Sequence, residues 1–383
     1  MKICDTQDCT GCFACINRCP VSCISVTQNG IGHVYVKVDE ERCINCVICR
    51  KICPANGYEA LNKPMDTYAA WSLDENEHKS SSSGGLATLL SRKTIAQGGV
   101  VYGCSSVCTD QVKHIRIDCL DDIPKLQGSK YVQSYTNDTY GNVKKDLKDG
   151  LKVLFIGTPC QIAGIYSFLG GDDDNLLTID LICHGVPPQK LMFEHIKNKT
   201  EINQEKTLSF REKNGYYLKI IHENNVIYHK SSLFDLYYIG FSKGLFFRDS
   251  CYQCQYANKN RTGDITLGDF WGLGKQIPFK HDIKSGVSVV LVNTAKGKAA
   301  FEGCKKDLFF EERTLDEAVA GNYNLRSPSA KHPNTEKFIG MYGIHGFDKA
   351  ARECLKKDII KYKILGLLQK SNLAMKIVGR IKG

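Results

Sequence analysis

The sequence lacks the long apolar runs that a membrane-spanning helix needs, which argues against an integral membrane protein. Its first residues, MKICDTQDC, also lack the apolar segment of a secretory signal. We therefore expect a protein of the reducing cytoplasm, where thiols stay reduced. The net charge is +10, but neither zinc-finger spacing nor interleaved basic and aromatic residues accompany it. Nucleic acid is therefore not an expected partner.

Cysteine, by contrast, is abundant, with 19 in 383 residues. The apolar share of 42% and the charged share of 24% are ordinary for a globular protein, so cysteine is the informative part of the composition. In a reducing compartment, dense cysteine clusters more often bind metals or carry out redox chemistry than form disulfides. The length predicts a small cysteine-rich module followed by a larger core.

Two stretches near the N-terminus share the spacing C-x2-C-x2-C-x3-C-P. They are CTGCFACINRCP at residues 9–20 and CINCVICRKICP at residues 43–54. In bacterial two-cluster ferredoxins, three cysteines of each motif bind one 4Fe-4S cluster and the fourth binds the other cluster. This spacing predicts one cluster on Cys9, Cys12, Cys15 and Cys53, and a second on Cys43, Cys46, Cys49 and Cys19. A pair of zinc sites is the alternative, although structural zinc usually takes paired C-x2-C units.

The remaining chain alternates strand and helix patterns. LKVLFIG and LLTIDLIC each lead through a turn into an apolar helix, as in an open, mostly parallel sheet. Residues 207–240 have the pattern of a small β lobe, and we place the glycine-rich residues 250–275 on a loop. After the strand VSVVLVNT we expect helices to the end of the chain. The predicted domains are an α+β ferredoxin-like module (1–62), an α/β core with a mostly parallel mixed sheet (63–340) and a basic helical tail (341–383).

Positive charge gathers at the end of that tail. Residues 347–383 hold ten Lys or Arg residues against three acids. Within KKDIIKYKILGLLQK, the apolar residues near helical spacing are Ile359, Ile360, Ile364, Leu367 and Leu368. We favour a packed helix with a solvated basic face, and a peripheral contact with a membrane surface is the alternative.

Eleven cysteines fall outside the duplicated motif. Four of them, expected at strand ends and loops, are candidates for a third cluster: Cys160, Cys183, Cys251 and Cys254. A zinc half-site or buried free thiols are the alternatives. Cys160 opens a helix, and we expect the helix dipole to lower its pKa. The others are interpreted as small buried hydrophobes or incidental thiols: Cys4, Cys23, Cys104, Cys108, Cys119, Cys304 and Cys354.

Five stretches, in order, resemble the beta-subunit family of coenzyme F420 hydrogenases and dehydrogenases: SSSGGLATLL, LQGSKYVQS, GTPCQIAGI, DLICHGVP and CYQCQYANKNRTGDITLGDFWG. The resemblance implies an α/β flavoprotein that holds FAD and iron-sulfur clusters, and it favours the third cluster. It also implies electron exchange with ferredoxin or another redox partner protein, and hydride exchange with coenzyme F420 or another small molecule. The alternatives are a non-catalytic electron-transfer adaptor without a substrate pocket and a zinc-stabilised binding module.

The resemblance also assigns flavin contacts to two segments. The residues are Ser82, Ser83, Gly84, Gly85 and Thr88 in the first, and Gly128, Ser129, Lys130 and Tyr131 in the second. Glycines let the backbone approach a phosphate, and a helix N-terminus offers free amides to an anion. A plain serine-capped helix is the alternative for the first segment, and a solvated surface lysine for Lys130. Asp264, Asp269 and Trp271 match the closing motif and are expected to hold the cluster loop and a cofactor wall, with a core position for Trp271 as an equal alternative. The scheme requires no general acid or base, and none is assigned.

Overall fold

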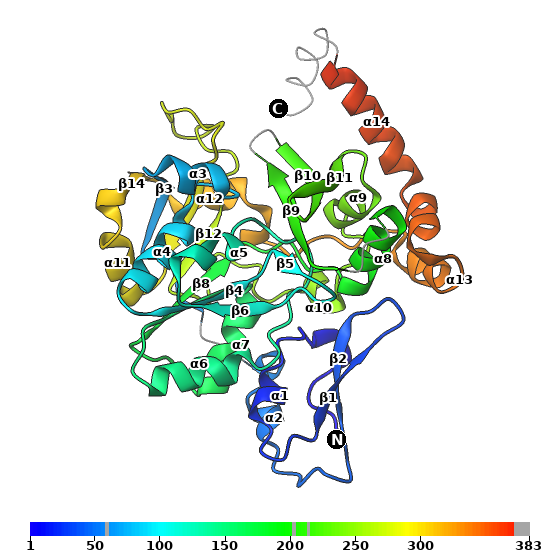
Figure 1. Cartoon of the computed structure of the whole chain (residues 1–383), viewed down its shortest axis with the longest axis horizontal. Coiled ribbons are helices and arrows are strands. Elements are labelled where there is room, and N and C mark those ends of the chain that lie inside the picture. The colour runs from blue at the N-terminus through cyan, green and yellow to red at the C-terminus, as the bar shows by residue number, and fades with distance from the viewer. Residues whose placement is uncertain (58–60, 201–203, 213–214, 371–383) are drawn as a thin grey trace.

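The computed structural model describes residues 1–57, 61–200, 204–212 and 215–370, with the side chains of residues 366–370 left aside. The last 13 residues of the predicted tail, and the side chains of Leu367 and Leu368, therefore lie outside the described part. Figure 1 shows a small N-terminal module, in dark blue, beside a larger core. The predicted fold class is confirmed: the core contains a large mixed sheet, a small antiparallel sheet and C-terminal helices.

The N-terminal module repeats one backbone turn in its two halves. β1 (Ile24–Gln28) pairs antiparallel with β2 (Val34–Val38), and the short helices are η1 (Thr6–Asp8), α1 (Ala14–Arg18), α2 (Ile48–Lys51) and η2 (Pro54–Asn56). Immediately before α1 and α2, Phe13 and Val47 have φ values of 63° and 53°. These residues hold equivalent positions in the two cysteine motifs. The sequence repeat is therefore also a repeat of the left-handed turn that precedes each helix.

The large sheet of the described core has eight strands. In spatial order they are β14 (Leu308–Glu312), β3 (Asp66–Ser72), β13 (Ser288–Val292), β12 (Ile265–Asp269), β8 (Leu176–Leu181), β7 (Val153–Gly157), β4 (Val100–Cys104) and β6 (His114–Ile117). Neighbours from β12 to β4 pair in parallel, and the outer neighbours pair antiparallel. The sheet is mixed as expected, and its parallel part is limited to the four central strands.

Helices cover both faces of this sheet. Val101 and Leu154 pack on one face with Leu89 of α4 (Leu86–Ala96), whereas Tyr102 and Phe155 point to the other face. That second face is covered by α6 (Thr139–Lys148) and α7 (Pro159–Leu169). The other short helices of this part are α3 (Glu75–Ser80), η3 (Leu120–Asp122), α5 (Ile123–Leu126), α11 (Ala295–Glu302), η4 (Lys305–Asp307), α12 (Leu315–Gly321) and η5 (Tyr323–Leu325). Burial on both faces explains why the central strands are apolar almost throughout.

The small β lobe shares one core with the C-terminal helices. Its sheet contains β11 (Asn225–Ser231), β10 (Gly215–His222), β9 (Lys206–Glu212) and β5 (Val107–Cys108). Its helices are α8 (Gln189–Thr200), α9 (Leu236–Ser242), α13 (Thr335–Cys354) and α14 (Lys356–Lys370). Phe338 and Phe347, both in α13, pack with Tyr237 of α9 in this core. The predicted boundary between residues 340 and 341 therefore falls inside a packed helix.

The described side chains of the basic helix α14, up to residue 365, are packed unevenly. Ile359 contacts the core of the β lobe, whereas Ile360 and Ile364 are 59% and 53% exposed. In Figure 1 the helix, in red, extends away from the rest of the protein. Among the described helices, none is long and apolar enough to span a bilayer.

Two strands appear where none was expected. The segment placed on a loop contains β12, which pairs with β8 and lies in the middle of the sheet. Its glycines hid it, and they are needed there because a Cβ on Gly268 would come within 2.8 Å of Ile182. The region expected to be helical to the end contains β14, which pairs with β3 at the sheet edge. Its short, polar-ended LFFEE segment gave no clear period-two pattern.

Candidate functional site

The cysteines of the duplicated motif gather into the two predicted sets. Burial raises the pKa of Cys15, and the neighbouring thiols of Cys12, Cys9 and Cys53 raise it further. In the second set, burial raises the pKa of Cys49, with Cys46 and Cys19 adding to the rise. Cys43 reaches the same set through a contact with Cys23, which in turn contacts Cys19. Such mutual repulsion of thiolates is what a bound metal would relieve.

Cys4 and Cys23 lie beside the predicted cluster ligands, and Cys23 is buried as expected. The neighbouring thiols of Cys53 and Cys9 raise the pKa of Cys4, so it lies beside the first predicted cluster set. The sulfur of Cys23 lies 3.5 Å from that of Cys19 in the second set, and the Cys23 amide donates to the same sulfur over 3.4 Å. Each set therefore has a fifth cysteine next to its proline-marked fourth ligand.

The four core cysteines also converge. Cys160 is the second residue of α7, directly after β7, and Cys183 follows the neighbouring parallel strand β8. Cys251 lies in the short helix α10 (Asp249–Tyr252), and Cys254 follows that helix. Burial raises the pKa of Cys183 to about 12, and Cys251 and Cys254 contribute to the rise. The carboxyl ends of two central strands thus meet the CYQC segment at one place, as open α/β sheets place their sites.

The pKa of the Cys160 thiol is raised, whereas the sequence led us to expect a lowered value. Burial raises its pKa well above the ordinary value, with Cys183 and Cys254 adding to the rise, although the Thr158 hydroxyl favours the thiolate. Desolvation disfavours the charged form more strongly than the helix start favours it. A metal bound at this position would instead deprotonate the thiol outright.

Across the described ranges, no three or more His, Cys, Asp or Glu side chains are arranged to hold a single metal ion. In a 4Fe-4S cluster, each cysteine ligates a different iron, so the four sulfurs surround a larger object than one ion. Sets of four converging cysteines fit that requirement. All 19 cysteines are free thiols in the structure.

The N-terminal module touches the core directly at the first cluster set. A Cβ on Gly164 of α7 would lie 3.2 Å from the Cys12 sulfur and 2.8 Å from the Tyr140 hydroxyl. The Thr136 hydroxyl donates to the Cys12 carbonyl over 2.8 Å. The helix that carries Cys160 in its first turn therefore packs against Cys12 further along.

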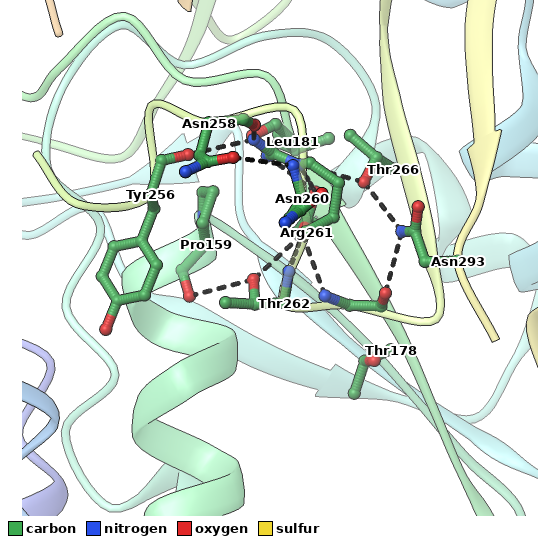
Figure 2. Close-up of polar contacts among 12 residues, drawn as sticks. Pro159, Thr178, Leu181, Tyr256, Asn258, Asn260, Arg261, Thr262, Thr266 and Asn293 are labelled. Carbon is green, nitrogen blue, oxygen red and sulfur yellow. Dashed lines mark hydrogen bonds and ion pairs between the residues drawn. The ribbon is translucent and has the colours of Figure 1, made fainter. Parts of the chain in front are cut away.

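A buried ion pair holds the loop that follows the CYQC segment. Arg261, 1% exposed, donates from Nε and Nη2 to Oδ1 of Asp180 at the end of β8. Its Nη1 donates to the carbonyls of Tyr256 and Asn258, each over 3.0 Å. Figure 2 shows Arg261 near Asn258 and Leu181, with Thr262 beside Pro159 in the first turn of α7. The network fixes the CYQC loop to the strand that leads to Cys183.

The two predicted flavin segments line one cavity of about 310 Å³. From the first segment the cavity takes Ser82, Ser83, Gly85 and Thr88, and from the second Gly128, Ser129, Lys130 and Tyr131. Cys160 and Cys183 lie in the same wall. Gly84 is not part of the lining, because it packs against β3, where a Cβ would come within 2.2 Å of the Ala70 carbonyl. The structure therefore brings eight of the nine predicted flavin contacts beside two predicted cluster ligands.

Hydrogen bonds tie the two flavin segments together. The Ser82 hydroxyl accepts from the Ser129 amide over 2.7 Å, and the two hydroxyls lie 2.9 Å apart. Lys130 is not on a solvated surface: burial lowers its pKa to about 8, and its ammonium donates to the carbonyls of Leu126 and Gln127. Tyr131 stacks on Phe241 with 4.6 Å between ring centroids. The cavity wall thus holds a buried cation whose hydrogen bonds, within the described part of the chain, go to neutral carbonyl oxygens.

Of the three residues in the closing motif, two line the cavity and one is buried elsewhere in the core. Trp271 is 45% exposed and lines the cavity, so the core alternative for it is wrong. Asp269 also lines the cavity and receives two hydrogen bonds from Arg211, at 2.9 and 2.7 Å. Asp264 is buried away from the cavity and accepts from the Thr178 amide and hydroxyl.

Several residues of the site carried no recognisable signal in the sequence. Arg261 and Asp180, which hold the CYQC loop, looked like ordinary charges among 51 basic and 41 acidic residues. Arg211 lies in the β lobe, and nothing in its local pattern indicated a partner 58 residues away. Gln161 belongs to the GTPCQ stretch, and its side chain forms a capping box with Thr158 that fixes the start of α7.

Fold and site define a two-part α/β protein in which a module with duplicated cysteine motifs packs on a core with four further converging cysteines. A family model for the C terminus of the coenzyme F420 hydrogenase/dehydrogenase beta subunit matches residues 150–318. Residues 150–318 therefore form a domain of the kind found at the C terminus of the coenzyme F420 hydrogenase/dehydrogenase beta subunit. The matched range contains all four core cysteines, whereas the flavin segments precede it.

Individual proteins show more distant likenesses. An uncharacterized protein of Methanocaldococcus jannaschii, MJ1349, is 26% identical over 212 residues, which cover 46% of this chain and 56% of that protein. The chain thus spans little more than half of that relative. An uncharacterized protein from the rpl9-rpl11 intergenic region of Porphyra purpurea is 41% identical over 54 residues, 14% of this chain and 72% of that protein. A chain of the F420-reducing [NiFe] hydrogenase complex from Methanosarcina barkeri has a TM-score of 0.46 at 17% identity, covering 78% of this chain and 91% of that one.

Proposed function

We propose that this chain is an iron-sulfur flavoprotein oxidoreductase that passes electrons between ferredoxin-type 4Fe-4S clusters and FAD. Hydride would be exchanged with coenzyme F420 or another reducible small molecule. The observation that carries the proposal is the cavity in which eight predicted flavin contacts meet Cys160 and Cys183. Flavin exchanges two electrons as hydride and passes them singly, whereas iron-sulfur clusters carry one electron at a time.

The chain's own residues would hold these groups in distinct ways. Three sets of four cysteines would ligate the clusters, two sets in the module and one in the core. The buried ammonium of Lys130 would face an electron-rich or anionic part of FAD, and the amides at the start of α4 would face its phosphates. Trp271 would bound the ring system at the cavity edge. No acid or base of the protein is needed for this exchange.

A second cavity favours an enzyme over an electron-transfer adaptor. It has a volume of about 260 Å³ and shares Ser82, Gly128 and Arg211 with the flavin cavity. Lys79 and Lys284 are among its other lining residues, so it fits a small anionic molecule. A substrate bound there would adjoin the proposed flavin site. The electron donor on the module side would be ferredoxin or another redox partner protein in the cytoplasm.

Anaerobic purification followed by joint analysis of flavin, iron and acid-labile sulfide tests the proposal. We expect FAD together with about twelve irons per chain, whereas about eight would indicate the two module clusters alone. The protein alone should then reduce a dye or a deazaflavin. Clusters without flavin or turnover would favour the adaptor, and zinc without flavin would contradict the proposed function.

A further inference from the structure

A buried arginine links the N-terminal module to the CYQC segment of the core. Arg248 is 1% exposed and directly precedes α10, and its carbonyl accepts from the Cys251 amide over 2.9 Å. Its Nη1 donates to the Cys9 carbonyl over 3.0 Å, and its Nη2 donates to the Val34 carbonyl and to Gln133. The guanidinium also lies over the ring of Tyr35, 4.9 Å from its centroid. One residue therefore joins two predicted cluster sets, through its side chain at Cys9 and through its backbone at Cys251.

Arg248 has no carboxylate partner in the described part of the chain. All its hydrogen-bond acceptors are carbonyl or amide oxygens, and its buried Nε has no partner. By contrast, the other fully buried arginine, Arg261, pairs with Asp180. A buried cation without a counter-charge is costly, so an anionic group is expected nearby. A cluster ligated by four thiolates is such a group.

Arg248 lies beside one cysteine of each of two sets. Its Nη1 donates to the Cys9 carbonyl, and its own carbonyl accepts from the Cys251 amide. The hydroxyl of Ser250 in α10 donates to the same Cys9 carbonyl over 3.2 Å, so the CYQC segment and the first module set are in direct contact. Within the described residues, no hydrogen bond of Arg248 reaches the second module set. The guanidinium therefore lies where the first module set and the core set meet.

We propose that Arg248 is a shared counter-cation that raises the reduction potentials of the cluster on Cys9, Cys12, Cys15 and Cys53 and of the core cluster, relative to the cluster on Cys43, Cys46, Cys49 and Cys19. This inference rests on the proposed function, since it requires that the three sets hold clusters. A positive charge stabilises the reduced, more negative state of each neighbouring cluster, and its effect is large where water is excluded. We call the two clusters near Arg248 the inner clusters and the one on Cys43, Cys46, Cys49 and Cys19 the outer cluster. Because both inner clusters shift in the same direction, Arg248 makes them stronger electron acceptors relative to the outer cluster than they would be without it.

Glycine at position 11 is part of this arrangement. Gly11 has φ +67°, and a Cβ there would come within 2.8 Å of Nη2 of Arg248 and 2.6 Å of Gln133. A side chain would therefore displace the guanidinium from the loop of the first cluster set. Arg248 acts as a positioning and tuning residue, because it contacts the backbone and the thiol surroundings of the clusters.

Redox titration of the loaded full-length protein, followed by electron paramagnetic resonance, tests the inference. In Arg248→Gln, the potentials of both inner clusters should become more negative, while that of the outer cluster stays at its wild-type value. Arg248→Lys keeps the charge and should leave the potentials closer to wild type than the glutamine variant does. Gln133→Glu places a carboxylate beside the intact Arg248, so it should also lower both inner potentials. This variant covers the case in which Arg248→Gln does not fold.

The possible results separate this inference from the proposed function. Iron analysis of the wild type comes first, and a protein without clusters would contradict the proposed function. Loaded variants with unchanged potentials would overturn the role of Arg248 alone. An equal shift of all three clusters, or an equal shift in the lysine and glutamine variants, would also overturn it, because either result indicates a general structural change.

Discussion

Oδ1 of Asp180 accepts two hydrogen bonds from Arg261, over 3.2 Å from Nε and 2.9 Å from Nη2. Oδ2 of the same carboxylate accepts from the amides of Thr262 and Gly263. Asp180 thus neutralises the buried guanidinium of Arg261 and fixes the loop that follows the CYQC segment. Cys254 and Cys183 lie at the two ends of this connection.

We expect Asp180→Asn to lower the free energy of unfolding by about 3–5 kcal/mol, because it leaves a buried arginine without its counter-charge. The variant should also lose about four irons, since the CYQC loop is no longer held. Chemical denaturation and iron analysis measure the two effects. Lys79→Ala is the control: it breaks the exposed pair with Glu75 and should cost less than about 1 kcal/mol. A similar loss in both variants would contradict the role assigned to Asp180.

Cys160→Ser tests the core cluster directly. The variant should lose about four irons per chain and keep the spectroscopic signal of the module clusters, because the sulfur of Cys160 is one of four core ligands. Cys119→Ser is the matched control, since Cys119 is exposed and outside every predicted set. Unchanged iron content in the Cys160 variant would show that the core set does not hold a cluster.

Lys130→Met should weaken FAD binding about tenfold or more, which corresponds to about 1.4 kcal/mol, while iron content stays constant. The reason is the loss of a buried ammonium from the cavity wall. Wild-type affinity should also fall as the pH rises above about 8, where burial lets this lysine lose its proton, and the variant should lack that dependence. Fluorescence titration of the flavin-free protein measures both quantities.

Lys125→Met supplies the comparison for that experiment. Lys125 lies five residues earlier, in α5, and pairs with Asp122 at the surface. Its replacement should leave FAD affinity within twofold of wild type, about 0.4 kcal/mol. Equal weakening in both variants would mean that general loss of positive charge, and not the position of Lys130, controls binding.

His195 predicts a pH dependence of stability in the β lobe. Although burial opposes its protonation, hydrogen bonds to Asp235 and Asp348 raise its pKa. The same contacts, against the effect of burial, lower the pKa of Asp348 to about 2, assisted by Lys199. Because folding raises the pKa of His195, its contribution to the free energy of unfolding is complete below about pH 6.5. That contribution is lost as the pH rises through the pKa of the folded state. The contribution of the Asp348 carboxylate to the free energy of unfolding is lost only as the pH falls toward about 2.

His195→Asn should therefore lower the free energy of unfolding by about 3 kcal/mol at pH 6, where it leaves Asp235 buried without its partner. The difference from wild type should shrink as the pH rises above neutrality. Thermal unfolding at a series of pH values measures it, and His222→Asn, at the last residue of β10, serves as the control. A difference that stays constant with pH would contradict an imidazolium at position 195.

The sequence indicated the elements whose local pattern is strong. The cysteine spacing predicted two sets that do converge, and apolar runs such as LKVLFIG predicted β7 and the helix that follows it. Expected positions at strand ends and loops made Cys160, Cys183, Cys251 and Cys254 candidates for a third cluster, and the family resemblance then favoured it. Spacing alone could not show that they converge, because the set joins residues up to 94 positions apart through the parallel order of β7 and β8.

Other features depend on tertiary contacts alone. β12 was hidden because Gly268 weakens the strand pattern, although the tight approach of Ile182 requires that glycine. The resemblance placed Lys130 in the flavin site, but only the fold shows how far desolvation lowers its pKa, and Arg248 gave no sign of its burial in the sequence. Burial of a charge depends on the whole environment around it, which one sequence does not reveal.

The close approach of Cys12 to Gly164 has a kinetic consequence. Because the module is covalently joined to the core and packs against the helix that carries Cys160, the two parts do not need to find each other by diffusion. In the loaded protein, electron exchange between the module and the core would be a first-order process, and its rate would not change on dilution. Only the encounter with an outside carrier would depend on concentration, so the two processes can be separated by varying the protein concentration in rapid-mixing experiments.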